Sequence, residues 1–412
     1  MLLSDARVFA AYAIFAGSYF VFAIGKFPWM KIDRPGAAII GAVLMVAFRI
    51  VGAQEALRSI DFATIVLLFS MMVIVANLRL GRFFERIAEW IVARLRPHHL
   101  LPTVIFTCGL LSAFLVNDIV CLVMTPFVLH MARRLGLPPI PYLVAVATAS
   151  NIGSVATITG NPQNMLIGSL SGIAYLDFLV HLGPIAAAGL LVNWALIDRF
   201  ALKGESDRVA VATVLAAPEF QYETMRKKPV AVLVAVLVGF LAGVPPALMA
   251  AIGAAVLLIT RTVEPKRVYD EIDWGLLVFF VGLFIIVAGA HRAGLTATLL
   301  EPIRNWDLHR IRIFVPVTAI LSNLVSNLPA VMLLRTLVAN FPDPHAGWLA
   351  LAMSSTLAGN LTITGSVANI IVVERAAAEG VEVGFREYAR IGMPVTAATI
   401  VIGSLWLWLT VS

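Results

Sequence analysis

Long apolar runs alternate with short polar segments along the whole chain. These runs cover residues 8–24, 37–47, 63–76, 185–197, 230–241, 248–259, 276–290 and 394–409. With weakly polar neighbours, most of them reach the roughly 20 residues that a helix needs to cross a bilayer. The pattern predicts an all-α polytopic membrane protein. The first run has no small-residue cleavage site and leads directly into further runs, so we interpret it as a membrane helix and not as a removed signal peptide.

Composition supports this prediction and limits the partners. The chain is 60% hydrophobic and 13% charged, with a mean hydropathy of +0.93, which is outside the range of soluble domains of this length. The net charge of +6 comes from basic residues between the apolar runs, as the positive-inside rule requires, so no nucleic-acid partner is expected. Cys108 and Cys121 lie in apolar segments, where we interpret them as packed thiols.

The sequence contains an internal duplication. Residues 40–61 align without a gap on residues 252–273, with Ile-Gly-Ala near the start and Ile-Asp at the end of both segments. Further along, TITGNPQN at 157–164 matches TITGSVAN at 362–369, and each is preceded by an interrupted apolar run, LVND at 115–118 and LVSN at 324–327. We therefore expect one repeat at residues 1–200, a second at 229–412, and a cytoplasmic linker at 201–228.

Each repeat is predicted to contain five transmembrane helices, one of them broken, and a re-entrant hairpin. The hairpins are expected at 101–134 and 311–340, and the broken helices at 141–172 and 346–377. Because each repeat crosses the membrane an odd number of times, the second repeat should be inverted relative to the first. If both termini are outside, most of the 30 Lys and Arg residues fall on cytoplasmic segments. The chain is thus predicted to be a multi-pass inner-membrane protein with both termini outside.

The paired interruptions are the predicted binding region. Residues 150–164 and 354–369 are rich in Gly, Asn, Ser and Thr and carry no charge, although a backbone freed from helical bonding needs polar partners inside a membrane. Small residues can also simply allow close helix packing, but two such segments at matched positions favour a site. The candidate binding residues are Asn117, Asn151, Thr157, Thr159, Asn161, Asn164, Asn327, Asn360, Thr362, Thr364, Ser366 and Asn369.

Asp118 is the candidate proton-coupling residue. It is the only acid between Glu89 and Asp177 and lies within an apolar run, where a charge costs about 2.5 to 3.5 kcal/mol. Burial disfavours the charged form of a carboxyl group, which suits reversible protonation during transport. The alternative is that Asp118 caps the helix that follows, and the two roles are compatible. Asn327 is neutral at the equivalent tip, and Arg335 is interpreted as a snorkelling residue outside the site.

Enzyme functions lack their motifs. The sequence has no GxxxxGK[ST] loop, no HExxH and no close group of His and Cys, so we expect no ATP-driven step, no metal site and no cofactor. A channel is a further alternative, although a mid-membrane acid beside two broken helices suits alternating access better.

Four motifs resemble the ion transporter superfamily, in particular the branch of arsenite efflux permeases, plant silicic-acid efflux transporters and related bacterial anion permeases. They are VNDIVCLVMTPFVL at 116–129, SNIGSVATITGNPQN at 150–164, SNLPAVML at 326–333 and AGNLTITGSVANIIV at 358–372. The resemblance covers nearly the whole chain. It implies a scaffold, an elevator-like transport region built from the hairpins and broken helices, a homodimer and proton-coupled export. Asp118 matches the family's hairpin acid, and Asn117 and Asn327 match its tip asparagines. Residues 358–369 look closer to the silicic-acid branch than to the arsenite pumps.

The predicted function is proton-coupled efflux of a small inorganic oxyacid, silicic acid or arsenite. Both solutes are neutral and rich in hydroxyl groups, so Asn, Ser and Thr can bind them without a cation. No convergent pair of Arg or Lys appears at the two motifs. The alternative is a Na⁺-coupled or H⁺-coupled importer of a dicarboxylate, sulfate or phosphate, with the positive charge supplied by bound Na⁺ or by helix N-termini.

Overall fold

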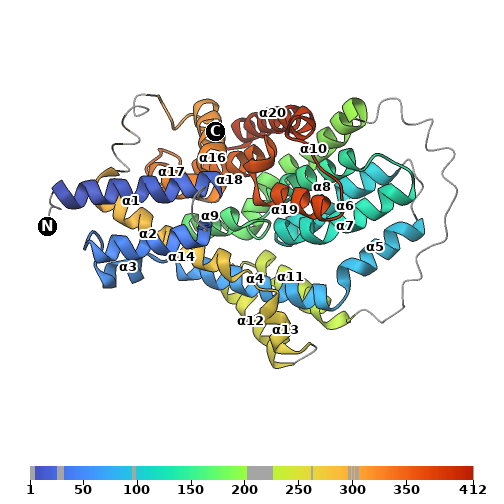
Figure 1. The fold of residues 1–412 in the computed structure, drawn as a ribbon, viewed down its shortest axis with the longest axis horizontal. Helices are drawn as coiled ribbons and strands as arrows, with labels where there is room; N and C mark the ends of the chain where they lie inside the picture. The colour runs from blue at the N-terminus through green and yellow to red at the C-terminus, as the bar shows by residue number, and fades with distance from the viewer. Residues whose placement is uncertain are drawn as a thin grey trace.

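The computed structural model describes residues 5–25, 32–94, 99–201, 226–260, 263–295, 298, 301 and 306–411, with the side chains of residues 90 and 92–94 excepted. Most of the linker predicted at 201–228 lies outside the described residues. Within these ranges the chain forms helices and no β-strand (Figure 1), so the all-α prediction is confirmed.

The first half of the chain contains ten helices within the described residues. They are α1 (Asp5–Ile24), α2 (Arg34–Ala47), α3 (Ala53–Ser59), α4 (Phe62–Leu80), α5 (Phe83–Arg94), α6 (Leu100–Phe114), α7 (Asn117–Arg134), α8 (Pro139–Ser154), α9 (Pro162–Ser171) and α10 (Tyr175–Ala201).

The second half repeats this order from α11 onward. Its described helices are α11 (Lys227–Leu241), α12 (Pro246–Ile259), α13 (Pro265–Asp270), α14 (Trp274–Arg292), α16 (Ile311–Val325), α17 (Asn327–Val338), α18 (Pro344–Leu357), α19 (Val367–Ala378) and α20 (Phe385–Thr410), with short 3₁₀ turns at Ala358–Asn360 and Ile363–Gly365.

Aspartates start the helices at equivalent places in the two halves. The Asp61 carboxylate accepts a hydrogen bond from Ala63 N (3.1 Å) at the start of α4, and Asp273 accepts one from Leu276 N (2.9 Å) at the start of α14. Asp is a good N-cap because its side chain satisfies amides that have no partner within the helix. The Ile-Asp pair that closes both copies of the aligned segment is therefore a helix-start signal.

The helices break at the four predicted interruptions. Helices α6 and α7 meet at residues 115–116, and α16 and α17 meet at Ser326. The backbone unwinds between α8 and α9 and between α18 and α19. The outer bounds of all four elements agree with the predicted ranges to within two residues. The orientation of these elements in the bilayer, and thus the inversion of the second repeat, stays a prediction.

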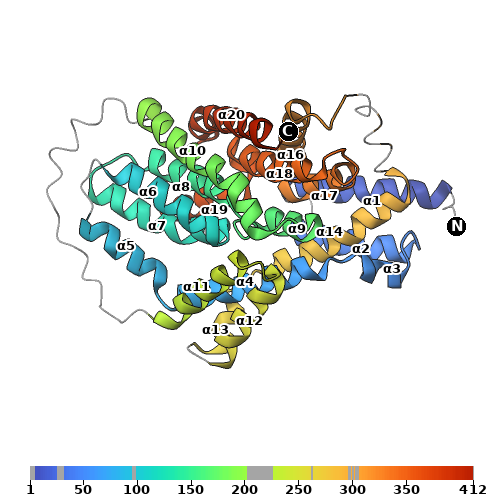
Figure 2. The same cartoon turned by 180° about the vertical axis from the view of Figure 1, so that it is seen from behind.

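Helices pair across the two halves in a reciprocal way. Helix α2 packs against α14, its counterpart α12 packs against α4, and α10 packs against α20. Such exchange of partners is what a two-fold relation between repeats produces. In Figures 1 and 2 the helices α4, α11, α12 and α13 lie on one side of the molecule, and α6, α7, α8, α10 and α20 lie on the other.

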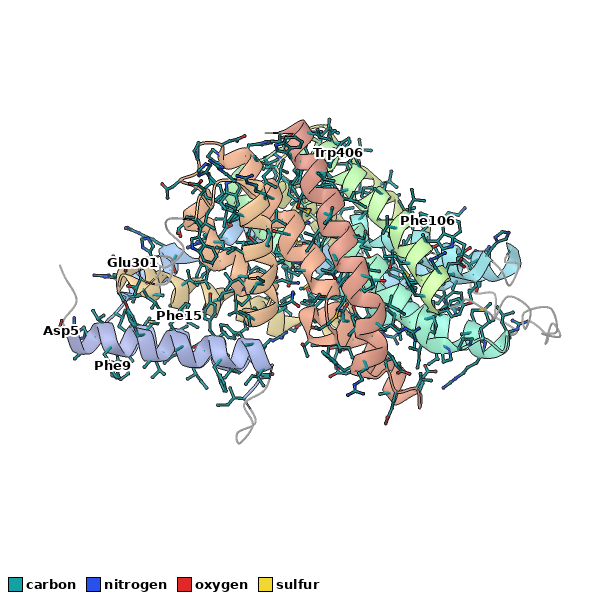
Figure 3. The ribbon with its side chains drawn as sticks, turned by 90° about the horizontal axis from the view of Figure 1, so that it is seen from above. Asp5, Phe9, Phe15, Phe106, Glu301 and Trp406 are labelled. Atoms are coloured by element: carbon teal, nitrogen blue, oxygen red, sulfur yellow. The ribbon has the colours of Figure 1, made fainter. Side chains whose placement is uncertain are left out.

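Five of the described helices are long and apolar enough to cross a membrane, namely α1, α4, α10, α14 and α20. The shorter apolar helices include both arms of the second hairpin. Large apolar side chains also cover the outer surface: in Figure 3, Phe9 on α1 points away from the rest of the molecule and is 76% exposed, while Phe15 on the opposite face is buried. Exposed apolar area on this scale fits contact with lipid, so the chain is a multi-pass membrane protein.

Candidate functional site

A cavity of about 230 Å³ forms where both hairpin tips meet both broken helices. The first tip contributes Asn117 and Asp118, and the second contributes Ser326 and Asn327. Leu328 of the second hairpin also lines the cavity. The other lining residues come from the starts of the second arms of the broken helices and from the starts of α2 and α14: Pro162, Gln163, Ser366, Val367, Arg34, Pro35, Asp273, Leu276 and Phe279. Six segments far apart in the sequence thus line one cavity.

Each hairpin tip is bonded to the unwound turn of its own repeat. Asn117 N donates to Gly160 O (3.0 Å). In the second repeat, the side-chain amide of Asn327 faces Gly365 O at 3.2 Å when its nitrogen is placed to donate. The two glycines occupy matching positions in TITG, and a Cβ on Gly160 would lie 2.2 Å from Ser154 O. The glycines therefore allow the close approach of backbone segments that shapes these turns.

The carbonyl groups freed by unwinding are satisfied by one asparagine in each repeat. Asn164 Nδ2 donates to Ser154 O and Thr157 O, both at 3.0 Å. Asn369 Nδ2 donates to the corresponding carbonyls, Gly359 O (2.7 Å) and Thr362 O (2.9 Å). Buried carbonyl groups need such partners inside a membrane. Because these bonds occupy the carbonyl groups, Asn164 and Asn369 hold the turns in shape.

Asn151 joins the two repeats at the centre of the molecule. Its side-chain oxygen accepts from Asn117 Nδ2 (3.0 Å) and from Ser366 Oγ (3.1 Å). Its nitrogen donates to Asn360 Oδ1 (2.9 Å) and Asn369 Oδ1 (3.0 Å). All five residues are buried. The network connects the first hairpin tip to both broken helices and fixes the back wall of the cavity.

The structure divides the predicted site residues into three groups. Asn117, Asp118, Asn327 and Ser366 line the cavity. A second group is buried in the network behind it, comprising Asn151, Asn161, Asn164, Asn360 and Asn369.

The threonines form the third group and lie outside the cavity lining. Thr157 Oγ1 donates to Ala113 O, and Thr159 Oγ1 bonds the Tyr175 hydroxyl at 2.9 Å. Thr362 and Thr364 are 3.3 Å apart at Oγ1 and bond each other. For these threonines the structure shows contacts that support the fold.

Two charged lining residues were not among the sequence candidates. Arg34 is one of the basic residues between the apolar runs, and Asp273 ends the second copy of the aligned segment. In the structure both interact electrostatically with Asp118. Arg34 also donates from Nε to Phe22 O (3.0 Å). The signals that could have indicated them were the helix starts at Arg34-Pro35 and Ile272-Asp273.

The lining has an excess of negative groups and one unused acceptor. Arg34 is its single cation within the described residues, against the carboxyl groups of Asp118 and Asp273. Arg335 is absent from the lining. Asn117 Oδ1 is buried and has no hydrogen-bond partner among the described residues. A buried acceptor of this kind has a strong preference for a donor from a ligand or from water.

The chain resembles known membrane proteins along most of its length, among them a transporter. It is 32% identical over 404 residues to the 46 kDa membrane protein of Mycobacterium leprae, covering 92% of this chain and 94% of the relative. It is 29% identical over 450 residues to the silicon efflux transporter LSI3 of rice, Oryza sativa subsp. japonica, covering 91% and 92%.

A solved structure and a family match agree with these relatives. The crystal structure of the YdaH transporter of Alcanivorax borkumensis matches with a TM-score of 0.55 and 15% identity, covering 98% of this chain and 97% of that chain, which shows a shared fold. Residues 19–358 match the family CitMHS, described as citrate transporter. The chain therefore belongs to the CitMHS citrate transporter family of secondary transporters.

Proposed function

We propose that the protein exports a small neutral oxyacid, silicic acid or arsenous acid, in exchange for protons. The cavity at the hairpin tips is the binding site in this proposal. Its polar lining consists mainly of amides and hydroxyls, from Asn117, Gln163, Ser326, Asn327 and Ser366. These groups donate and accept hydrogen bonds, as a solute with several hydroxyl groups requires.

The strongest support for this proposal is the side-chain oxygen of Asn117, which has no hydrogen-bond partner among the described residues. A neutral oxyacid can donate a hydroxyl proton to Asn117 Oδ1, whereas a fully ionised oxyanion or carboxylate only accepts hydrogen bonds. The charges of the lining residues also favour a neutral solute. Two carboxyl groups against one guanidinium disfavour a multivalent anion and leave a neutral solute little affected.

Asp118 is the proposed proton carrier. It is half-buried in the cavity wall and interacts with both Arg34 and Asp273. When Asp118 is deprotonated it attracts Arg34 and repels Asp273, and protonation removes both effects. A change of proton occupancy thus alters how the first hairpin tip is held against α2 and α14, which is the coupling that exchange needs.

The repeat supports alternating access for this solute. Arg34 starts α2 as Pro246 starts α12, and Asp273 precedes α14 as Asp61 precedes α4. A second cavity, of about 380 Å³, is lined by Ala63, Leu67 and Pro246 of these counterpart helices and by Tyr175 of α10. We propose that the hairpins and broken helices move in an elevator-like manner between the α2–α14 end and the α4–α12 end of a scaffold. The loop charges further support an inner-membrane location with both termini outside, and the family resemblance supports a homodimer.

The second candidate is import of an anion, such as a dicarboxylate, sulfate or phosphate, coupled to Na⁺ or H⁺. Arg34 favours it, because a guanidinium in the wall can pair with a carboxylate or phosphate. The family description, citrate transporter, agrees with this class.

Transport in everted vesicles tests both candidates. Vesicles with an acidic interior should accumulate silicic acid or arsenite, and Asp118→Asn should abolish the dependence on the pH gradient. Asp307→Asn is the matched control, because Asp307 is exposed and pairs with Arg310 at 3.3 Å. Uptake that ignores the pH gradient, or that Asp118→Asn leaves unchanged, contradicts proton-coupled export. Citrate or sulfate uptake that requires Na⁺ would establish the second candidate.

A further inference from the structure

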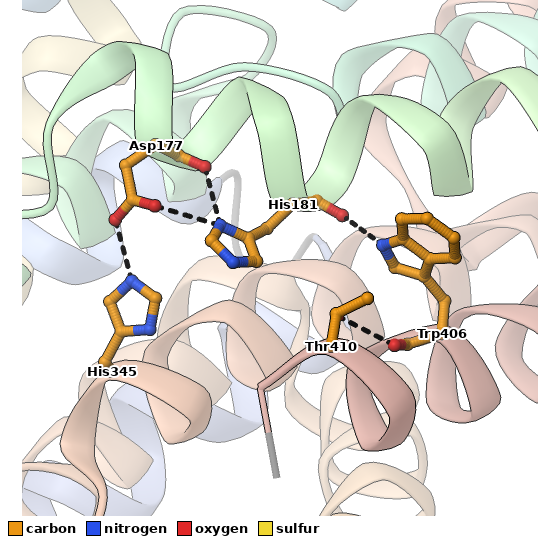
Figure 4. Close-up of polar contacts among 5 residues, drawn as sticks. All are labelled: Asp177, His181, His345, Trp406 and Thr410. Atoms are coloured by element: carbon orange, nitrogen blue, oxygen red, sulfur yellow. Dashed lines mark hydrogen bonds and ion pairs between the residues drawn. The ribbon is translucent and has the colours of Figure 1, made fainter.

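Two histidines and one aspartate gather at one end of the helical bundle, outside the cavity lining. Asp177 and His181 lie on the first two turns of α10, and His345 is the second residue of α18 (Figure 4). Asp177 Oδ1 is 2.9 Å from His181 Nδ1, and Asp177 Oδ2 is 2.7 Å from His345 Nε2. One ligand atom from each residue lies within 4.8 Å of the other two.

We propose that Asp177, His181 and His345 form a binding site for a divalent transition metal ion such as Zn²⁺. Two imidazole nitrogens and one carboxylate oxygen are a ligand set that zinc sites use, with a fourth position left open for water. Harder ions such as Ca²⁺ and Mg²⁺ prefer oxygen ligands only. The side chains are 39%, 21% and 37% exposed, so a hydrated ion can reach them.

The metal-free arrangement is consistent with such a site. The carboxylate lies between the two rings. Each ring nitrogen that faces it carries a proton in one tautomer and a free lone pair in the other. Metal binding requires the lone pair at His181 Nδ1 and His345 Nε2, with the ring protons on His181 Nε2 and His345 Nδ1. His181 Nδ1 also lies 2.9 Å from Asp177 O, so the ring must turn away from that carbonyl to bind an ion.

The site would connect the two repeats within the bundle that carries the cavity. Helix α10 directly follows the second arm of the first broken helix, and α18 is the first arm of the second. Trp406 Nε1 donates to His181 O (2.9 Å) and adds α20 to the same junction (Figure 4). A bound ion would therefore stabilise the folded bundle by mass action. No metal site was predicted from the sequence, because α10 and α18 belong to different repeats and no short motif joins the three residues.

Metal binding to the purified full-length chain in detergent tests the proposal. After treatment with a chelator, Zn²⁺ should raise the midpoint of thermal unfolding, and Co²⁺ should give a visible absorption band that saturates at one ion per chain. His181→Gln and His345→Gln should each weaken Zn²⁺ binding by at least about tenfold. His309→Gln is the control, since His309 is exposed in the segment before α16, and it should bind as the natural chain does.

Three results would overturn the proposal. The first is an unfolding midpoint that does not change with Zn²⁺, Ni²⁺ or Co²⁺. The second is a rise in the midpoint that both histidine substitutions leave intact. The third is a loss of Zn²⁺ binding in His309→Gln that equals the loss in the other two variants. If one substitution prevents folding, Asp177→Asn provides a variant with the same shape and a weaker ligand. All these measurements are made without transport, so their failure leaves the proposed oxyacid export untouched.

Discussion

The junction at Asn151 allows a quantitative test of how the two repeats are held together. Replacing Asn151 with alanine removes four hydrogen bonds, two accepted from Asn117 and Ser366 and two donated to Asn360 and Asn369. Side-chain hydrogen bonds in membrane proteins average about 0.6 kcal/mol and reach about 1.7. Four of them, with partners left buried and unpaired, predict a loss of about 2–4 kcal/mol in the free energy of unfolding.

Asn193 offers a matched control in the same bundle. It is also buried, but its side-chain oxygen accepts a single bond, from Thr148 Oγ1 at 3.1 Å. Thr148 keeps its bond to Val144 O (2.8 Å) when Asn193 is lost. Asn193→Ala should therefore cost less than about 1 kcal/mol.

Thermal unfolding of the purified chain can be followed with a thiol-reactive dye, because Cys108 and Cys121 are free and buried in the folded state. Asn151→Ala should lower the unfolding midpoint several times further than Asn193→Ala. Equal shifts for the two variants would refute the view of Asn151 as a junction. An unchanged midpoint together with lost transport would instead identify Asn151 as a substrate ligand.

Three other substitutions test the cavity and its frame. Arg34→Gln should leave the KM for silicic acid within about threefold. If the chain instead imports an anion through Arg34, the same substitution should raise the KM for that anion at least tenfold in transport assays, because a hydrogen bond to a charged group contributes about 1.5–3 kcal/mol. Ser326→Gly should raise the unfolding midpoint, because Ser326 has φ 77° and ψ 155°. This conformation costs a residue other than glycine about 1–3 kcal/mol, and a lower midpoint in the variant would refute the strain. Gly160→Ala should lower both stability and transport, because its Cβ would meet Ser154 O at 2.2 Å; normal transport would contradict the close approach.

Much of the fold could be predicted because membrane insertion imposes strong and local sequence signals. Apolar runs mark the long helices, and the interruptions by Asn, Gly and Pro mark the breaks between helices. The repeated TITG segments predicted that both turns would have the same chemistry. Their matching bonds from Asn164 and Asn369 show why the motif contains an asparagine at its end.

The site was harder to predict because its walls come from distant segments. A pattern of residues shows which positions are polar, but it does not show where each side chain points. Thr157 and Thr159 were therefore included although their hydroxyls bond Ala113 and Tyr175. Arg34 lies between two apolar runs of the sequence, and only the packing of α2 against α14 brings it beside the hairpin tips.

In the proposed mechanism, proton coupling depends on the positions at which the two repeats differ. The shared residues, such as Gly160 and Gly365, build two equivalent turns and two equivalent tips. The tips then differ by a carboxyl group, since Asp118 in the first repeat follows a tip asparagine as Leu328 does in the second. The scaffold differs by a cation, since Arg34 starts α2 where Pro246 starts α12. A perfectly symmetric protein would hold a proton equally well at either end. Because Asp118 and Arg34 each occur in only one repeat, protonation of Asp118 would favour one arrangement over the other in this mechanism, and coupled transport requires such a difference in free energy.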